Sequence, residues 1–302
     1  KNNIKKKLRE DLIMINQITI IGPGLIGSSL GLAIKKKKLA KIIIGIDNNK
    51  INLSHAIEKG AIDYGFNKID HKICNTDIFF LCTPVKTFES IIYNLLPYLK
   101  KNSIISDVGS VKNIFKKNTV KKIKEKADLV PGHPIAGTEF SGAKNSKSNL
   151  FSNKWCILTP ENSEPNNLKI VKKIWEKIGM KVSVMSGDEH DKLMSVTSHL
   201  PHLIAFTIVS TAFKFNQSEK NRFLNFSAGG FRDFTRIAAS DPTMWKDIFL
   251  TNKKNILKTV KEFTKDIETF RKLIEFEDEK KILNFIKKTK FIRKKIVKLN
   301  QP

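Results

Sequence analysis

The chain has 302 residues, of which 40% are hydrophobic and 9% aromatic, enough to build one large or two ordinary folded domains. No uninterrupted run of about 18 or more apolar residues occurs, so we expect no membrane span. The three cysteines show neither a disulfide framework nor metal-ligand spacing. This usage favours a reducing, cytoplasmic location.

The basic charge is large but dispersed. The chain has 55 Lys and Arg residues against 29 Asp and Glu residues, a formal net charge of +26, and only six of the basic residues are arginines. A nucleic-acid-binding protein usually concentrates its charge on one element and interleaves aromatic residues. Dispersed lysine is typical of a solvated basic surface that attracts small anions. We therefore expect a small anionic ligand and no nucleic-acid partner.

Residues 1–13 (KNNIKKKLREDLI) are polar and basic. They lack the apolar central region of about 7–15 residues that a secretory signal needs. We expect them to be a disordered extension outside the fold, which starts at Met14.

Apolar runs alternate with helical patterns through the first part of the chain. The runs predict strands at residues 18–21, 42–46, 77–82 and 104–107, and the periodic segments between them predict helices at 27–39, 51–59 and 86–100. Such alternation predicts an α/β fold with a parallel sheet that is covered by helices on both faces. A helix ending near Gly179 and a strand from Lys181 to Met185 are expected to complete this sheet.

A glycine-rich turn separates the first predicted strand from the first predicted helix. Residues 22–27 read GPGLIG, which gives Gly22, Gly24 and Gly27 the GxGxxG spacing of a dinucleotide site. There the first glycine permits a tight turn, the second lets the backbone approach a pyrophosphate, and the third lets helix and strand pack closely. The helix N-terminus at Leu25 and Ile26 attracts the anion. The alternative is a glycine turn in a sheet protein that binds no dinucleotide.

Two more strand ends fit a dinucleotide. Asp47 ends the second predicted strand, where a carboxylate can accept hydrogen bonds from ribose hydroxyls and repel a 2′-phosphate. This favours NAD, although Lys50 keeps NADP possible. Thr83 and Pro84 follow the third predicted strand, and the carboxyl ends of such strands line the ligand crevice.

The next polar clusters offer chemistry, each with an ordinary structural alternative. Ser110 follows the fourth predicted strand and could cap a helix or point its hydroxyl into the crevice. His133 lies between prolines, upstream of the Thr138-Glu139 pair, and could be a general base or a loop histidine held by backbone.

His199 and His202 are three residues apart in an apolar helical pattern that Pro201 interrupts. They share one helix face if the helix continues through the proline. A metal site would need more ligands than His190 and Asp191 supply nearby, so no metal is expected. Substrate contact or packing is the better interpretation.

Two of the six arginines, Arg232 and Arg236, lie within five residues of each other. A guanidinium binds a carboxylate through two parallel hydrogen bonds, which lysine cannot do. We expect one of the pair to hold a substrate carboxylate and the other to be structural.

Only helical patterns follow Ser186, which forms a capping-box pattern with Glu189, and Asp241-Pro242 predicts a further helix start. We therefore expect a dinucleotide-binding domain over residues 14–186 and a helical domain over residues 187–302. The active site is expected in the cleft between them.

Taken together, these motifs resemble the prephenate/arogenate (cyclohexadienyl) dehydrogenases of tyrosine biosynthesis. The matching blocks are GPGLIGSSL, DVGSVK, GHPIAGTEFSG, SHLPH and GGFRDFTRIAASDPTMW, and the similarity runs from about Gln17 to the C-terminal helix.

The resemblance implies a Rossmann domain followed by an all-helical domain that mediates homodimerisation. It implies oxidation of the ring carbinol of prephenate or arogenate by hydride transfer to NAD(P), with loss of carbon dioxide. His133 matches the catalytic histidine, Ser110 the serine that orients the hydroxyl, and Arg236 the arginine that binds a carboxylate. Other positions that match the substrate pocket are His202, Thr138 and Glu139.

Two other interpretations stay open at this point. A different two-domain oxidoreductase, such as a hydroxyacid dehydrogenase or an imine reductase, would explain the glycine turn but not the His133 and Arg236 blocks together. A basic NAD-sensing or nucleic-acid-binding protein would bind nucleic acid with a steep salt dependence and would show no turnover.

Overall fold

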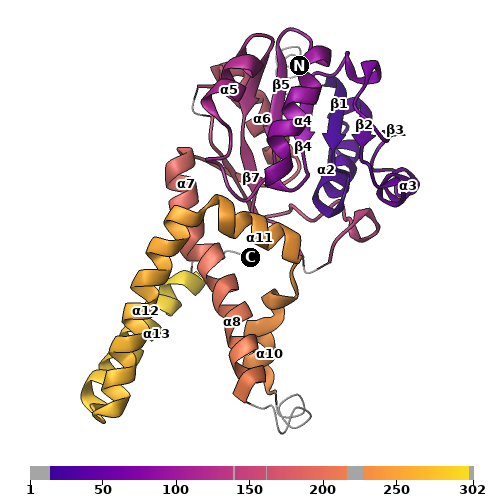
Figure 1. Ribbon diagram of the computed structural model, residues 1–302. Coiled ribbons are helices and arrows are strands. Elements are labelled where there is room, and N and C mark those ends of the chain that lie inside the picture. The colour runs from indigo at the N-terminus through magenta and orange to yellow at the C-terminus, as the bar shows by residue number, and fades with distance from the viewer. Residues whose placement is uncertain (1–13, 139, 161, 216–226, 299–302) are drawn as a thin grey trace, which may run out of the picture.

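The computed structural model describes residues 14–138, 140–160, 162–215 and 227–298. The expectations for residues 1–13 and for Glu139 lie outside this part of the chain. The described chain has a sheet part, which comes first, and a helical part that begins at Gly187 and lies against one edge of the sheet part (Figure 1).

The main sheet has six parallel strands in the order β3-β2-β1-β4-β5-β6. All four strands predicted between residues 18 and 107 belong to it, which confirms the α/β fold. The sequence does not predict the two outer strands, because neither is a continuous apolar run: β3 reads Tyr-Gly-Phe and β6 reads Ala-Asp-Leu-Val. The strands are β1 (Ile15–Ile21), β2 (Ala40–Ile46), β3 (Tyr64–Phe66), β4 (Ile78–Leu81), β5 (Ser103–Asp107) and β6 (Ala127–Val130).

Helices cover both faces of the main sheet, as its continuous apolar strands require. In β4, Phe80 packs in the core on one face, while Phe79 packs in the core on the other face. The first face is covered by α2 (Leu25–Lys36), α3 (Lys50–Glu58) and α6 (Pro165–Lys177), and the second by α4 (Phe88–Leu95) and α5 (Lys117–Lys124).

A second, three-stranded sheet follows β6. Its strands are β7 (Gly132–Pro134), β8 (Trp155–Leu158) and β9 (Lys181–Val184), with β8 antiparallel to β7 and parallel to β9. The expectation that the strand from Lys181 completes the main sheet is therefore wrong. The chain leaves the main sheet at Pro131, which has no N–H for another ladder bond, and β9 then pairs with β8 instead. As a result, His133 lies on a short strand.

The helical part begins where the capping pattern predicts, since the Ser186 hydroxyl accepts a hydrogen bond from the Glu189 N–H at 3.1 Å. Asp241 likewise caps a helix by accepting from the Met244 N–H at 2.7 Å. The helices are α7 (Gly187–Met194), α8 (Leu200–Phe215), α10 (Gly229–Thr235), α11 (Pro242–Thr251), α12 (Lys253–Glu275) and α13 (Glu279–Lys298).

A π-helical turn, Ser195–His199, joins α7 to α8, so the helix continues through Pro201. The helix from Gly187 to Lys214 is long and apolar enough, by length and composition, to cross a membrane, which the criterion of an uninterrupted apolar run does not detect. The structure buries 22% of its most apolar window. Figure 1 shows α8 with α10 as one arm and α12 with α13 as a second arm, both extending away from the sheets.

We expect Phe151→Ala to lower the free energy of unfolding by about 3–5 kcal/mol, because a buried aromatic residue leaves a cavity when truncated. The Phe151 ring is fully buried against Trp175, which in turn contacts Phe80 of β4. Urea unfolding at a fixed protein concentration measures the loss. Ile51→Ala, at a position that is 67% exposed on α3, is the control and should change the value by less than about 0.5 kcal/mol.

Candidate active site

A cavity of about 1650 Å³ is lined by residues of both sheets and of the helical part. It collects side chains that follow the carboxyl ends of β1, β2, β4 and β5, where a doubly wound sheet binds its ligand. Of the site residues predicted from sequence, those that line this cavity are Gly22, Gly24, Leu25, Ile26, Asp47, Thr83, Pro84, Ser110, His133, Thr138, His202 and Arg236. Gly27 lies behind the lining, and Glu139 is outside the described residues.

The three glycines of the turn have different surroundings. Gly22 has a φ of +84°, and a Cβ there would lie 2.6 Å from Thr83 Cγ2. At Gly27 a Cβ would lie 2.5 Å from the Gly22 carbonyl oxygen, so close packing requires glycine. Gly24 differs, because nothing lies within 4 Å of the place its Cβ would occupy. This open side, at the uncapped N-terminus of α2, fits a pyrophosphate.

Asp47 directly follows β2 and lines the same cavity. Its carboxylate accepts hydrogen bonds from the Asn49 N–H at 2.9 Å and from the Asn52 amide at 3.3 Å. These bonds fix the side chain and leave it partly exposed, which fits a group that accepts hydrogen bonds from ribose hydroxyls. The residues present therefore fit a dinucleotide.

A buried ion pair holds the segments that carry Ser110 and His133. The Lys112 ammonium contacts the Asp107 carboxylate and donates to the Gly132 carbonyl at 2.5 Å. Asp107 also accepts from the N–H groups of Gly109 at 2.8 Å and Gly132 at 3.2 Å. The end of β5 and the start of β7 are thus tied together from both sides.

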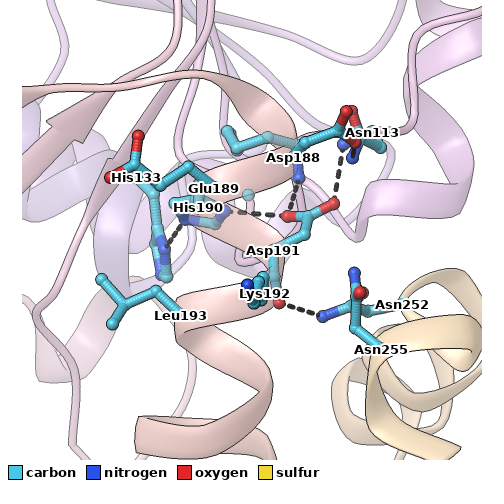
Figure 2. A network of polar contacts seen from close by, with 12 residues as sticks. Asn113, His133, Asp188, Glu189, His190, Asp191, Lys192, Leu193, Asn252 and Asn255 are labelled. Carbon is cyan, nitrogen blue, oxygen red and sulfur yellow. Dashed lines mark hydrogen bonds and ion pairs between the residues drawn. The ribbon is translucent and has the colours of Figure 1, made fainter. Parts of the chain in front are cut away.

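His133 lies on β7 with 8% of its surface exposed. Its Nδ1 is 2.8 Å from Nε2 of His190, which leaves Nε2 of His133 for a ligand (Figure 2). Burial, together with the charges of His190, Lys112 and His199, holds the pKa of His133 well below its ordinary value. The ring is therefore neutral at neutral pH and can accept a proton.

Ser110 is partly buried in the loop after β5, and no helix starts there, since α5 starts at Lys117. The helix-cap interpretation of Ser110 is therefore wrong, and the structure places this residue at the cavity.

His202 and His199 differ in position although both lie on the helix that runs through Pro201. The His202 ring stacks on Trp245 with centroids 3.8 Å apart, and its Nδ1–H donates to the Ser198 carbonyl at 2.9 Å. Burial lowers the pKa of His202, and the charge of Arg236 lowers it further. His199 is fully buried, and its Nδ1 accepts from the Asn252 amide at 3.2 Å.

The two arginines also differ in position. Arg236 lines the cavity close to His202, whereas Arg232 does not line it.

Thr138 is exposed at the cavity, and its hydroxyl accepts from the Phe140 N–H at 3.2 Å. Within the described part of the chain, no group of three or more His, Cys, Asp or Glu side chains could hold a metal ion.

Sequence reasoning considered His190 and Asp191 only as metal ligands and did not single out Lys112 or Trp245. His190 bonds to a residue 57 positions away, and Lys112 bonds to the carbonyl of a residue 20 positions away. No local spacing reports such contacts. The one signal available was a histidine next to a carboxylate in the first turns of a helix.

A doubly wound sheet with this glycine turn, and a neutral histidine on the same cavity, define a dinucleotide-dependent oxidoreductase with a helical second domain. Comparison with known proteins narrows this class. Residues 30–184 match the family model "Prephenate dehydrogenase, nucleotide-binding domain", and residues 186–288 match "Prephenate dehydrogenase, dimerization domain". The chain belongs to the prephenate dehydrogenase family.

Relatives agree over nearly the whole chain. The cyclohexadienyl dehydrogenase of Zymomonas mobilis is 32% identical over 93% of this chain and 96% of its own length. The prephenate dehydrogenase of Bacillus subtilis is 34% identical over 93% of this chain and 76% of its own. The crystal structure of the Aquifex aeolicus prephenate dehydrogenase with hydroxyphenyl propionate and NAD⁺ superimposes with a TM-score of 0.87 at 37% identity, covering 93% of this chain and 98% of that one.

The buried histidines should make the fold sensitive to acid. Burial lowers the pKa of His199 from 6.5 to about 4. Below pH 6.5 His199 binds a proton in the unfolded chain but stays unprotonated in the folded chain. The free energy of unfolding therefore falls as the pH drops towards about 4.

Replacing His199 by glutamine removes this proton uptake. We expect His199→Gln to reduce the slope of unfolding free energy against pH, over this interval, by up to about 1.4 kcal/mol per pH unit. Denaturant unfolding of both proteins across the interval measures the two slopes. Equal slopes would show that His199 keeps an ordinary pKa in the fold.

Proposed function

We infer that this chain catalyses the oxidative decarboxylation of prephenate or arogenate with transfer of a hydride to NAD, and that His133 is its general base. One observation carries the assignment of the base. In the cavity that also contains the glycine turn and Arg236, the outer nitrogen of neutral His133 is left for a ligand while its Nδ1 is backed by the ring of His190, whereas Nδ1 of His202 is held by a backbone carbonyl.

The proposed chemistry starts at the ring hydroxyl of the substrate. His133 Nε2 takes the hydroxyl proton, and the electrons of the O–H bond form the carbonyl as hydride leaves the same ring carbon. Bound NAD supplies the hydride acceptor. The bond from the ring to its carboxylate then breaks, carbon dioxide leaves, and the electrons of that bond make the ring aromatic, which turns the carbonyl into a phenolate oxygen that takes up a proton. Because aromatisation drives this last step, the protein mainly orients the reactants and removes the proton.

Other cavity residues bind and orient the substrate in this proposal. Ser110 positions the ring hydroxyl, and Arg236 binds a substrate carboxylate through a pair of hydrogen bonds. His202 is held by its stacking on Trp245 and lines the same pocket, as Thr138 does, and Glu139 is assigned to this pocket from its motif. At the cofactor end, Asp47 binds the ribose, with Thr83 and Pro84 beside the turn.

We place the boundary between the two domains at residue 186, between the last strand and the first helix of the helical part. A cytoplasmic location stays a prediction.

A second copy of the chain is the proposed partner of the helical domain. No residue of α13 is buried, although this helix carries several apolar side chains that are about half exposed. The exposed apolar side chains of α12, α13 and α8 include Ile267, Ile274, Leu283, Ile286, Phe291, Ile208, Val209 and Phe213. Exposed apolar side chains in such number mark an interface, and residues 186–288 match a dimerization domain. We therefore propose a homodimer.

Replacing the base should separate turnover from binding. We expect His133→Asn to lower kcat by about 10²–10⁴-fold, because asparagine cannot accept the proton. The affinity for NAD should stay within about threefold, since the substitution leaves the glycine turn untouched. Initial rates with prephenate and with arogenate, and titration of NAD binding, measure both quantities. Wild-type turnover in the variant would remove His133 as the base, and His71→Asn at an exposed site is the control.

Loss of the substrate clamp should appear in KM. Arg236→Ala is expected to raise KM for prephenate by about tenfold or more, because a charge-assisted pair of hydrogen bonds is lost. Arg232→Ala, four residues away and outside the cavity lining, is the matched control and should leave KM within about twofold. If the two variants behave alike, Arg236 is not the clamp.

The dimer is tested by mass in solution. The chain has a mass of 34.4 kDa, so sedimentation equilibrium should give twice that value. Ile286→Glu buries a charge in the proposed interface and should shift the protein towards monomer. Ile51→Glu makes the same change on exposed α3 and should leave the dimer intact. A monomeric wild-type protein at micromolar concentration contradicts the proposal.

A further inference from the structure

A second buried histidine lies directly behind His133. His190 is on α7 and is fully buried. Its Nε2 is 2.8 Å from Nδ1 of His133, and its Nδ1 is 2.8 Å from Oδ1 of Asp191. Figure 2 shows the three side chains in a row, with the His190 ring between the His133 ring and the carboxylate of Asp191.

The surroundings of Asp191 decide which way these hydrogen bonds run. Its Oδ1 accepts from the Lys112 N–H at 2.7 Å, and its Oδ2 accepts from the Asn113 N–H at 2.9 Å. A carboxylate surrounded by N–H donors acts only as an acceptor. His190 therefore carries its hydrogen on Nδ1 and donates it to Asp191.

The donor and acceptor nitrogens of His190 then determine those of His133. Burial lowers the pKa of His190, so the ring is neutral, and with its hydrogen on Nδ1 its Nε2 is an acceptor. His133 must donate from Nδ1 to make the 2.8 Å contact. The lone pair of His133 is then on Nε2, which is the nitrogen a substrate hydroxyl needs.

We propose that His190 and Asp191 are positioning residues that hold His133 in the tautomer with its hydrogen on Nδ1 and share the positive charge that His133 gains during the reaction. The proposal rests on the proposed role of His133 as base. When Nε2 takes the substrate proton, the Nδ1 hydrogen of His133 can move to His190 Nε2. The charge of +1 then lies on the ring next to the carboxylate of Asp191. The row as a whole thus gains the one proton that leaves the substrate, and it gives up a proton again when the phenolate oxygen of the product is protonated.

The other charges around the pair make this sharing necessary. Lys112 lies close to both rings and opposes a positive charge on either, and its own charge is balanced by Asp107 from the end of β5. A proton on His199, from the π-helical turn, would also repel a positive charge on His133, and burial of His199 keeps its ring neutral. Asp191 is thus the carboxylate that bonds directly to the His190 ring, and it is linked to His133 only through that ring.

A purely architectural role is the competing interpretation, since Asp191 also joins two segments of the fold. The experiment must therefore distinguish tautomer control from packing. Glutamine at position 190 keeps hydrogen-bonding atoms of similar reach, but it cannot take up a proton, and its amide can turn to donate to His133. His199→Gln is the matched control, because it replaces another fully buried histidine on the same continuous helix.

The kinetic arm compares His190→Gln, His199→Gln and His133→Asn with the wild type. In hydrolases that hold a catalytic histidine with a carboxylate, loss of the correct tautomer costs about 10⁴-fold in kcat. For His190→Gln we expect kcat to fall by about 10²-fold or more, with KM and NAD affinity within about threefold. His199→Gln should keep kcat within about threefold. Equal losses in the two glutamine variants, or an unchanged kcat in His190→Gln, would overturn the proposal.

The spectroscopic arm is measured on the wild-type protein and does not require His190→Gln to fold. Nitrogen-15 NMR of the wild-type protein at neutral pH reports which ring nitrogen of His133 carries hydrogen, with His133→Asn identifying the signal. We expect hydrogen on Nδ1 of both His133 and His190. Hydrogen on Nε2 of His133 would overturn the proposal even if His190→Gln were inactive.

His133→Asn tests the base, and His190→Gln tests the positioning role. If His133→Asn keeps wild-type turnover, the base assignment in the proposed function is wrong, and the role of the row falls with it. If His133→Asn loses turnover while His190→Gln does not, the base stands and only the positioning role is wrong.

Discussion

The carboxylate of Asp191 is the contact on which the arrangement of the two parts depends. It is buried, and its two oxygens accept backbone N–H groups from Lys112 and Asn113, in the loop that carries Ser110. The backbone carbonyl of Asp191 accepts a hydrogen bond from the side-chain amide of Asn252, at the start of α12, at 2.7 Å. A buried carboxylate without such donors would be costly. The helical part therefore docks where these donors are, and the docking sets how the Ser110 loop faces His133.

Lys112 extends this contact into the sheet part. Its backbone N–H bonds to one buried carboxylate, that of Asp191, while its ammonium pairs with the other, that of Asp107. The ammonium also bonds to the carbonyl of Gly132, next to His133. One residue thus fixes the distance between α7, the end of β5 and the short strand β7. Its charge, together with burial, keeps both neighbouring histidines neutral, which a base requires before it receives a proton.

Much of the fold and of the cavity could be predicted from sequence, wherever the residues that carry the signal are close together in the chain. The glycine turn, Asp47 and Ser110 each follow a recognisable strand, and strands of one parallel sheet end at one edge, so the cavity could be assembled from the order of motifs. The pairing of β9 could not, because a short strand reading Lys-Val-Ser-Val fits the edge of either sheet, and only the departure of the chain from the main sheet at Pro131 decides between them. The row from His133 to Asp191 depends on contacts between distant segments, and a histidine beside an aspartate in a helix is compatible with many different arrangements.

The π-helical turn at Ser195–His199 has a consequence for how the two ends of one helix relate. A π turn contains one residue more than an α turn, and each residue of an α-helix adds a rotation of about 100°. The helix that carries His190 and Asp191 at one end carries His202 and the exposed apolar side chains of α8 at the other. Their angular offset is set by that extra residue. Deleting one residue there would leave the buried row in place and turn His202 off Trp245, together with the whole outer face of α8. The angle between the buried row and the exposed apolar face of α8 is thus set by the length of a single turn.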